Sequence, residues 1–198
     1  LFRAGGKAVS DAGGQVFGLW TPLIGFASNR GIAITAWPDP EAADRQDDLL
    51  LDGMAELLDS DGERLVPTAR PTLFRPPREP GIYAFRWFDL QAADWPEFLA
   101  LSREAWPAFE QAFEAEILGF WRSLEVAEPL ARVLLLTRYP SLEAWERSRH
   151  DFKTDAEKAT AARFRRRREL TDTTLVVAMQ LATDVASATR TIGSKPGA

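Results

Sequence analysis

The chain alternates apolar and polar positions most clearly in the segment GIYAFRWF, residues 81–88. Three aromatic side chains fall on one side of an extended backbone and Arg86 falls on the other. This period of two predicts a β-strand whose two faces have different uses. Over residues 95–113 the large aromatic residues recur at intervals close to 3.6, which predicts a helix with one aromatic stripe. Pro107 lies within it and is expected to kink the helix or split it in two.

The pattern continues into a complete unit. Residues 115–124 and 131–139 read as two strands. Ser141 can cap a short helix that ends near residue 150, and the Thr-x-x-Glu spacing at 154–157 predicts a capping box that opens a further helix. Residues 173–182 form a last strand. The predicted order is β-α-β-β-α-β, the ferredoxin-like arrangement, with its second helix in two pieces.

The layout of this unit occurs twice. RVLLLTRYPSLEAWERSR at 132–149 is preceded by GFW at 119–121, and RGIAITAWPDPEAADR at 30–45 is preceded by GLW at 18–20. In the earlier copy we expect strands at 15–20 and 31–37, a helix from Pro40 to about Leu58 and a last strand at 64–72. Aligning Trp20 with Trp121 aligns Leu1 with Ser102, so the first strand and half of the first helix of this copy are expected upstream of the sequence.

The predicted fold class is therefore α+β, with tandem ferredoxin-like units that form a dimeric α+β barrel-type architecture. Residues 1–72 form the first unit, 73–80 a proline-rich connector, 81–184 the second unit and 185–198 a tail. A four-stranded sheet with helices on one face must bury the other, and two such sheets placed face to face achieve this. We expect a homo-oligomer, a dimer or a higher assembly.

Composition narrows the class of protein. The chain has 198 residues, 45% of them hydrophobic, with seven Trp and twelve Phe, which is enough for a packed core. No segment has the roughly 18 apolar residues of a membrane helix, so a cytoplasmic location is the default expectation. A net charge of −5 argues against nucleic-acid binding, even with the basic run at 163–168, and the absence of cysteine excludes disulfides and thiolate chemistry.

Five segments carry a resemblance to a known family. The chain resembles the NIPSNAP-type proteins of the dimeric α+β barrel superfamily, in particular bacterial members with two such units, over about residues 13–183. The segments are LVPTARPT, FRWFD, LSREAWPAFE, LLLTRYPSLEAWERSR and FRRRRELTDTT. The superfamily includes cofactor-free quinone-forming monooxygenases, lactone isomerases, polyketide cyclases, haem-degrading enzymes and haem peroxidases. The resemblance therefore implies a fold and does not select an activity.

Three arginines are candidates for holding an anionic ligand: Arg70, Arg86 and Arg138. A guanidinium inside an aromatic-lined barrel could clamp a carboxylate or an enolate in bidentate geometry. The alternative is that these arginines pair with Glu104, Glu110 or Glu116 and tie a helix to the sheet.

Glu110 is the candidate general base, because it flanks the aromatic stripe and burial would raise its pKa. Its alternative role is that of a solvent-facing carboxylate or an arginine partner. The aromatic residues expected to shape the pocket, or else to fill the core, are Trp20, Trp106, Trp121 and Tyr139.

His150 is the only histidine and the only possible axial ligand for haem, but its place at the end of a predicted helix favours a capping role. A metal site would need several His or Cys ligands, so we expect no metal, haem or organic cofactor. Four aspartates at 44, 47, 48 and 52 lie on one helix face and are interpreted as a solvated surface.

These observations predict a protein that binds or converts a small aromatic or anionic molecule in the barrel. If it is an enzyme, Arg86 or Arg70 holds the anion, Glu110 moves the proton, and Trp106 and Trp121 shape the pocket. The competing hypothesis is a non-catalytic interaction protein whose barrel is filled by its own side chains. An interior space of about 300 Å³ or more favours ligand binding, and a close-packed interior favours the scaffold.

Overall fold

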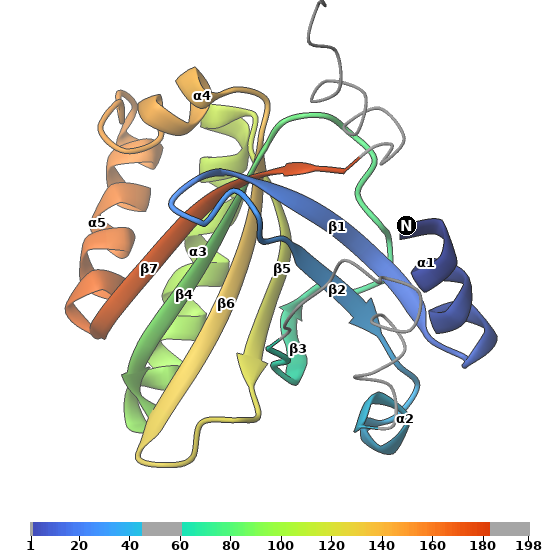
Figure 1. Cartoon of the computed structure of the whole chain (residues 1–198). Helices are drawn as coiled ribbons and strands as arrows, with labels where there is room; N and C mark the ends of the chain where they lie inside the picture. The colour runs from blue at the N-terminus through green and yellow to red at the C-terminus, as the bar shows by residue number, and fades with distance from the viewer. Residues whose placement is uncertain (1, 45–60, 183–198) are drawn as a thin grey trace, which may run out of the picture.

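The computed structural model describes residues 2–44 and 61–182 (Figure 1). The elements, in order, are α1 (Phe2–Asp11), β1 (Gln15–Ile24), β2 (Ile32–Ala36), α2 (Pro40–Asp44), β3 (Leu65–Arg70), β4 (Ile82–Gln91), the 3-10 helix η1 (Ala92–Asp94), α3 (Trp95–Phe113), β5 (Glu116–Ser123), β6 (Leu130–Tyr139), α4 (Leu142–Arg147), α5 (Asp155–Glu169) and β7 (Thr171–Leu181). The seven strands form one antiparallel sheet in the order β2-β1-β7-β4-β6-β5-β3. No helix in the described part of the chain is long and apolar enough to cross a membrane.

The second unit has the predicted order β-α-β-β-α-β. Its strands lie side by side as β7-β4-β6-β5, with α3 and α5 packed along one face (Figure 1). The predicted capping box opens α5, where the Thr154 side chain accepts from the Glu157 N–H and the Glu157 carboxylate accepts from the Thr154 N–H. Pro107 does not split α3, contrary to one of the two expected outcomes. Pro107 and Arg103 are both exposed, so water can satisfy the carbonyl that the proline leaves free.

The strands of the first unit lie at the two edges of this central sheet. β1 pairs with β7 and carries β2 outside it, while β3 pairs with β5 at the opposite edge. In both cases the second strand of one unit pairs with the last strand of the other. The sheet is thus continuous and curled, and its curl brings Phe17 of β1 against Trp121 of β5 on one face. In the second unit β4 lies between β6 and β7. Within the described residues, no strand occupies the equivalent position between β2 and β3.

Two hydrophobic clusters lie on the two faces of the sheet. On the helix-covered face, side chains such as Phe88 and Phe120 pack against α3 residues such as Phe98. The other face, which we call the inner face, is lined only by strand residues among its buried members. Along β4, Tyr83 and Phe85 point to the inner face and Ala84 and Phe88 point to the helices, so the predicted two-faced strand is confirmed.

A Gly-x-Trp segment occurs at equivalent places in β1 and β5. The ring of Trp20 lies over Gly18, and the ring of Trp121 lies over Gly119, so closely that a Cβ atom on either glycine would overlap the ring. Each strand also shifts its register at the glycine, between Val16 and Gly18 against β2 and between Ile117 and Gly119 against β6. The two segments therefore share this local geometry as well as their Gly-x-Trp sequence.

Some expectations fall outside the described residues. The helix of the first unit is described only as α2, Pro40–Asp44, so its predicted extent to Leu58 lies beyond the described part. The same holds for the side chains of the acidic face at residues 44, 47, 48 and 52. The tail at 185–198 also lies outside.

Candidate functional site

The inner face is filled by its own side chains. Its buried members are Phe17, Trp20, Tyr83, Phe85, Trp121, Leu134, Leu136, Val177 and Met179. Trp20 and Phe85 meet edge to face with ring centroids 5.0 Å apart, and Phe17 and Trp121 do so at 5.9 Å. Both tryptophans proposed as pocket walls are therefore packed core residues, with 1% and 6% of their surface exposed. One polar atom stays unsatisfied there, the buried Nε1 of Trp20.

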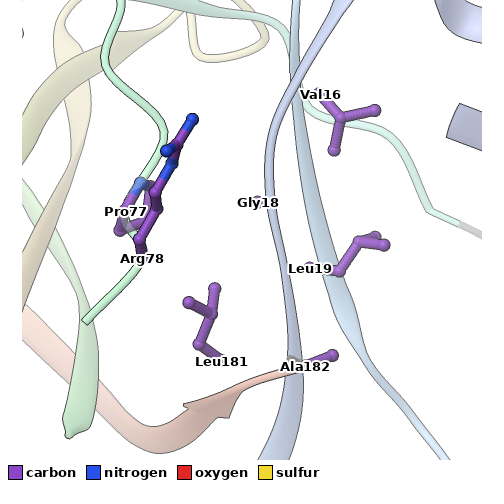
Figure 2. Close-up of a pocket in the computed structure, with 7 residues that line it drawn as sticks. All are labelled: Val16, Gly18, Leu19, Pro77, Arg78, Leu181 and Ala182. Atoms are coloured by element: carbon purple, nitrogen blue, oxygen red, sulfur yellow. The ribbon is translucent and has the colours of Figure 1, made fainter. Parts of the chain in front are cut away.

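A hollow of about 380 Å³ opens at the end of the inner face. The residues that line it are Val16, Gly18, Leu19, Pro77, Arg78, Leu181 and Ala182. Figure 2 shows the connector residues Pro77 and Arg78 across the hollow from β1, with the end of β7 beside them. Arg78 has the only charged or polar side chain among the described lining residues. This site was not predicted from the sequence, because its three segments are distant along the chain and the GLW segment of β1 indicated only a repeated strand.

Glu110 and Arg70 form a bidentate ion pair between α3 and β3. The Nη1–Oε1 distance is 2.5 Å and the Nη2–Oε2 distance is 3.1 Å. Glu110 Oε1 also accepts from the Ile117 N–H at 2.8 Å, and the Arg70 guanidinium lies over the Trp106 ring, 5.1 Å from its centroid. Both carboxylate oxygens are thus engaged, and the pair ties the helix to the sheet as the alternative interpretation predicted.

Arg138 also has a carboxylate partner. Its Nε donates to Glu116 at 3.2 Å and its Nη1 donates to the Pro80 carbonyl at 3.1 Å. Tyr139, the next residue, belongs to the cluster on the helix-covered face and packs edge to face against Phe109 at 6.2 Å. The remaining carboxylate named in the sequence analysis, Glu104, pairs with Arg163 of α5.

Arg86 differs from the other two candidates, because no ion pair or hydrogen bond of its side chain occurs within residues 2–44 and 61–182. Its Nε is buried without a partner. Burial lowers the pKa of Arg86 below its ordinary value, and the nearby Arg149 and Arg168 lower it further, while Tyr139 opposes them. Arg86 lies between Ala84 and Phe88 on β4, so its side chain leaves the sheet on the helix-covered face.

The structure therefore separates the predicted site residues. Trp20 and Trp121 lie on the inner face, whereas Trp106 and Tyr139 belong to the cluster under the helices. Arg70 contacts both Glu110 and Trp106, and Arg86 is not among its described partners. The proposed anion-binding residues Arg70 and Arg86, with the proposed base, thus lie on the helix-covered side of the sheet, whereas Trp121 lies on the inner face. His150 is exposed just after α4.

The fold and the comparisons agree on the class of protein. A curled antiparallel sheet with a complete ferredoxin-like unit defines an α+β protein of the kind predicted. Residues 83–180 match the NIPSNAP family, and this range coincides with the second unit.

Two solved structures are similar in fold. A provisionally assigned monooxygenase from Lactobacillus acidophilus aligns with a TM-score of 0.56 at 12% identity, over 90% of this chain and 84% of that one. An anthrone oxidase-like protein aligns with a TM-score of 0.49 at 15% identity, over 83% and 75% of the two chains. No curated protein sequence matches this chain. At these identities the likeness concerns the fold.

Proposed function

We propose that this NIPSNAP-type chain binds a small apolar molecule with one negatively charged group, in the hollow at the end of the inner face. The observation that carries the proposal is the lining: the β1 backbone at Gly18 and the Leu181 side chain face the connector, which supplies Pro77 and the single cation of Arg78 (Figure 2). Small-molecule sites combine apolar walls with a few placed polar groups in this way. The site lies beside β1 and the end of β7, outside the buried cluster that fills the inner face.

Binding is favoured over conversion. The described lining residues contain no carboxylate, imidazole or hydroxyl that could move a proton. Glu110, the candidate base, is held by Arg70 and the Ile117 N–H elsewhere in the fold. The monooxygenase described above is similar in fold only. Oxygenation of an activated aromatic substrate would need a proton acceptor beside the substrate, and the described lining residues supply none. The proposal includes no metal, haem or other cofactor.

The filled inner face favours a second candidate, a non-catalytic interaction protein. Close packing of nine buried side chains leaves that face as a structural core. In this case the hollow would have no ligand of its own. The expectations of a homo-oligomer and of a cytoplasmic location remain predictions under both candidates.

The two candidates differ in one binding experiment. The wild-type chain is titrated with 2-naphthoate and decanoate, and with the uncharged 2-naphthol, by isothermal calorimetry. Ligand binding predicts that the carboxylates bind and that Arg78→Gln weakens them about tenfold, while binding of 2-naphthol is unchanged. Arg75→Gln is the matched control, since Arg75 is exposed in the same connector and does not line the hollow.

Leu181→Asp tests the apolar part of the lining. The introduced carboxylate should repel the carboxylates of 2-naphthoate and decanoate and weaken the binding of both. If none of the three compounds binds, or if Arg75→Gln and Arg78→Gln weaken binding equally, the proposal is wrong. The interaction-protein candidate then stands. Sedimentation of the same wild-type sample gives the oligomeric state.

A further inference from the structure

Two arginines, Arg86 of β4 and Arg167 of α5, lie under the helices, where the Arg167 guanidinium packs over Phe88, two residues from Arg86 on the same side of β4. Arg167, in the last turn of α5, has only 5% of its surface exposed, and its Nη1 donates to the Ser102 hydroxyl at 3.1 Å. Its guanidinium lies 4.8 Å from the ring centroids of Phe88 and Phe164. Burial lowers the pKa of Arg167 to about 9, and the positive charge of Arg86 contributes in the same direction.

This cluster, which we define as Arg86, Arg149, Arg167 and Arg168, has no carboxylate within it. The charged groups that act on Arg86 are Arg149 and Arg168, and those that act on Arg167 are Arg86 and Arg168. No side-chain carboxylate in the described part of the chain pairs with any of the four, although Arg163 and Arg166 of the same helix pair with Glu104 and Glu97. The basic run of α5 is thus divided into paired surface arginines and an unpaired group.

An unpaired buried cation is costly. Removing a charge from water costs several kcal/mol, and neighbouring cations add repulsion unless an anion compensates them. Cation–π contacts and one hydroxyl offset only part of this cost for Arg167. Arg86 has a buried Nε with no partner at all. Since the side chain of Arg86 is only partly buried, an anion can reach it from solvent.

We propose that this cluster is a binding site for a small oxyanion with two negative charges, of the phosphate class. Arg86 supplies a donor fork from β4, Arg167 supplies a second one from α5, and the exposed Arg149 and Arg168 attract the anion. Tyr139, at the end of β6, adds a hydroxyl whose described neighbours give it no hydrogen bond. The site lies on the helix-covered face, so it is separate from the hollow of the proposed function and goes beyond it.

Inorganic phosphate is the probe. Equilibrium dialysis with radiolabelled phosphate should show one site per chain for the wild type, and Arg86→Met should weaken binding at least tenfold. Arg163→Met is the matched control, because Arg163 lies on the same helix and pairs with Glu104 at the surface; it should bind phosphate as the wild type does. Sodium acetate at equal ionic strength should not compete.

Urea unfolding gives an independent readout. Phosphate should raise the urea midpoint of the wild type and leave that of Arg86→Met unchanged. Without phosphate, Arg86→Met should unfold at a higher urea concentration than the wild type, because it removes an uncompensated charge.

The proposal is overturned if dialysis shows no stoichiometric phosphate, or if Arg86→Met and Arg163→Met reduce binding equally. It is also overturned if Arg86→Met dissociates an oligomer, since the counter-charge would then come from a second copy.

Discussion

Replacing Gly119 by alanine should destabilise the protein through Trp121. The backbone at Gly119 has no left-handed conformation, so alanine is not strained there, and in a strand it would ordinarily stabilise by about 0.5–1 kcal/mol. The added Cβ, however, would overlap the six-membered part of the Trp121 ring. That ring is held by Phe17 and the rest of the inner face, so it cannot move away freely.

The magnitude follows from two limits. If the ring stays in place, the cost is that of overpacking, about 1–3 kcal/mol. If the ring is expelled, the loss approaches that of Trp121→Ala, about 3–5 kcal/mol for a core tryptophan. We therefore expect about 3 kcal/mol for Gly119→Ala. In the double variant Gly119→Ala/Trp121→Ala the indole ring is absent, so the added Cβ overlaps nothing. The free energy of unfolding of this double variant should therefore equal that of Trp121→Ala within about 1 kcal/mol.

Urea unfolding followed by far-ultraviolet circular dichroism measures these values without relying on tryptophan emission. Gly6→Ala is the control for the glycine change itself. Gly6 lies in α1, and its added Cβ would meet Val16 of β1 at an ordinary 3.9 Å, so this substitution should stabilise the protein slightly. Additive losses in the double variant would refute the reasoning, because they would show that the alanine acts on something other than the ring. A small loss for Trp121→Ala alone would show that the inner face is not a packed core.

Three further predictions concern polar contacts. Glu110→Ala should cost about 2 kcal/mol in urea unfolding, because it leaves the Arg70 guanidinium without its carboxylate; unchanged stability with loss of an activity would restore Glu110 as a base. The Arg132 hydrogen bond lowers the pKa of Asp89, so this carboxylate stabilises the fold above its unfolded pKa, about 4, and loses this contribution as the pH falls through its lower folded pKa. The stability difference between wild type and Asp89→Asn, below about 1 kcal/mol, should thus be constant from about pH 7 to 5 and decline as the pH falls further; a difference that does not decline between about pH 5 and pH 2 would contradict this. Thr154→Ala should cost about 1 kcal/mol through loss of the α5 cap, whereas Thr154→Ser should retain most of it.

The second unit could be predicted from sequence because each of its elements carries a local signal. The two-residue period of β4, the aromatic stripe of α3 and the capping box at Thr154 each involve neighbours in the chain. The placement of the first unit could not be predicted in the same way. Pairing of β3 with β5 joins residues at least fifty positions apart, and no local pattern records which sheet edge a strand will occupy.

The candidate site shows the same limit. Alternation along β4 correctly placed Arg86 opposite Tyr83, but it did not say which of the two faces the helices cover. Arg86 was therefore assigned to the barrel interior, while the structure directs it toward the helix-covered face. Arg167 was missed within a run of four arginines. Its spacing from Phe164 and Leu170, three residues on either side, was the available signal that it lies on the buried side of α5.

The two edge pairings of the central sheet, β1 with β7 and β3 with β5, join the two halves of the chain. The four strands of the second unit are neighbours in space, so this unit can complete its own sheet. In the described part of the first unit, β1 pairs with β2, whereas β3 lies at the opposite edge of the sheet. During synthesis β1 and β3 leave the ribosome before β7 and β5, so neither edge pairing can form until its later strand has emerged.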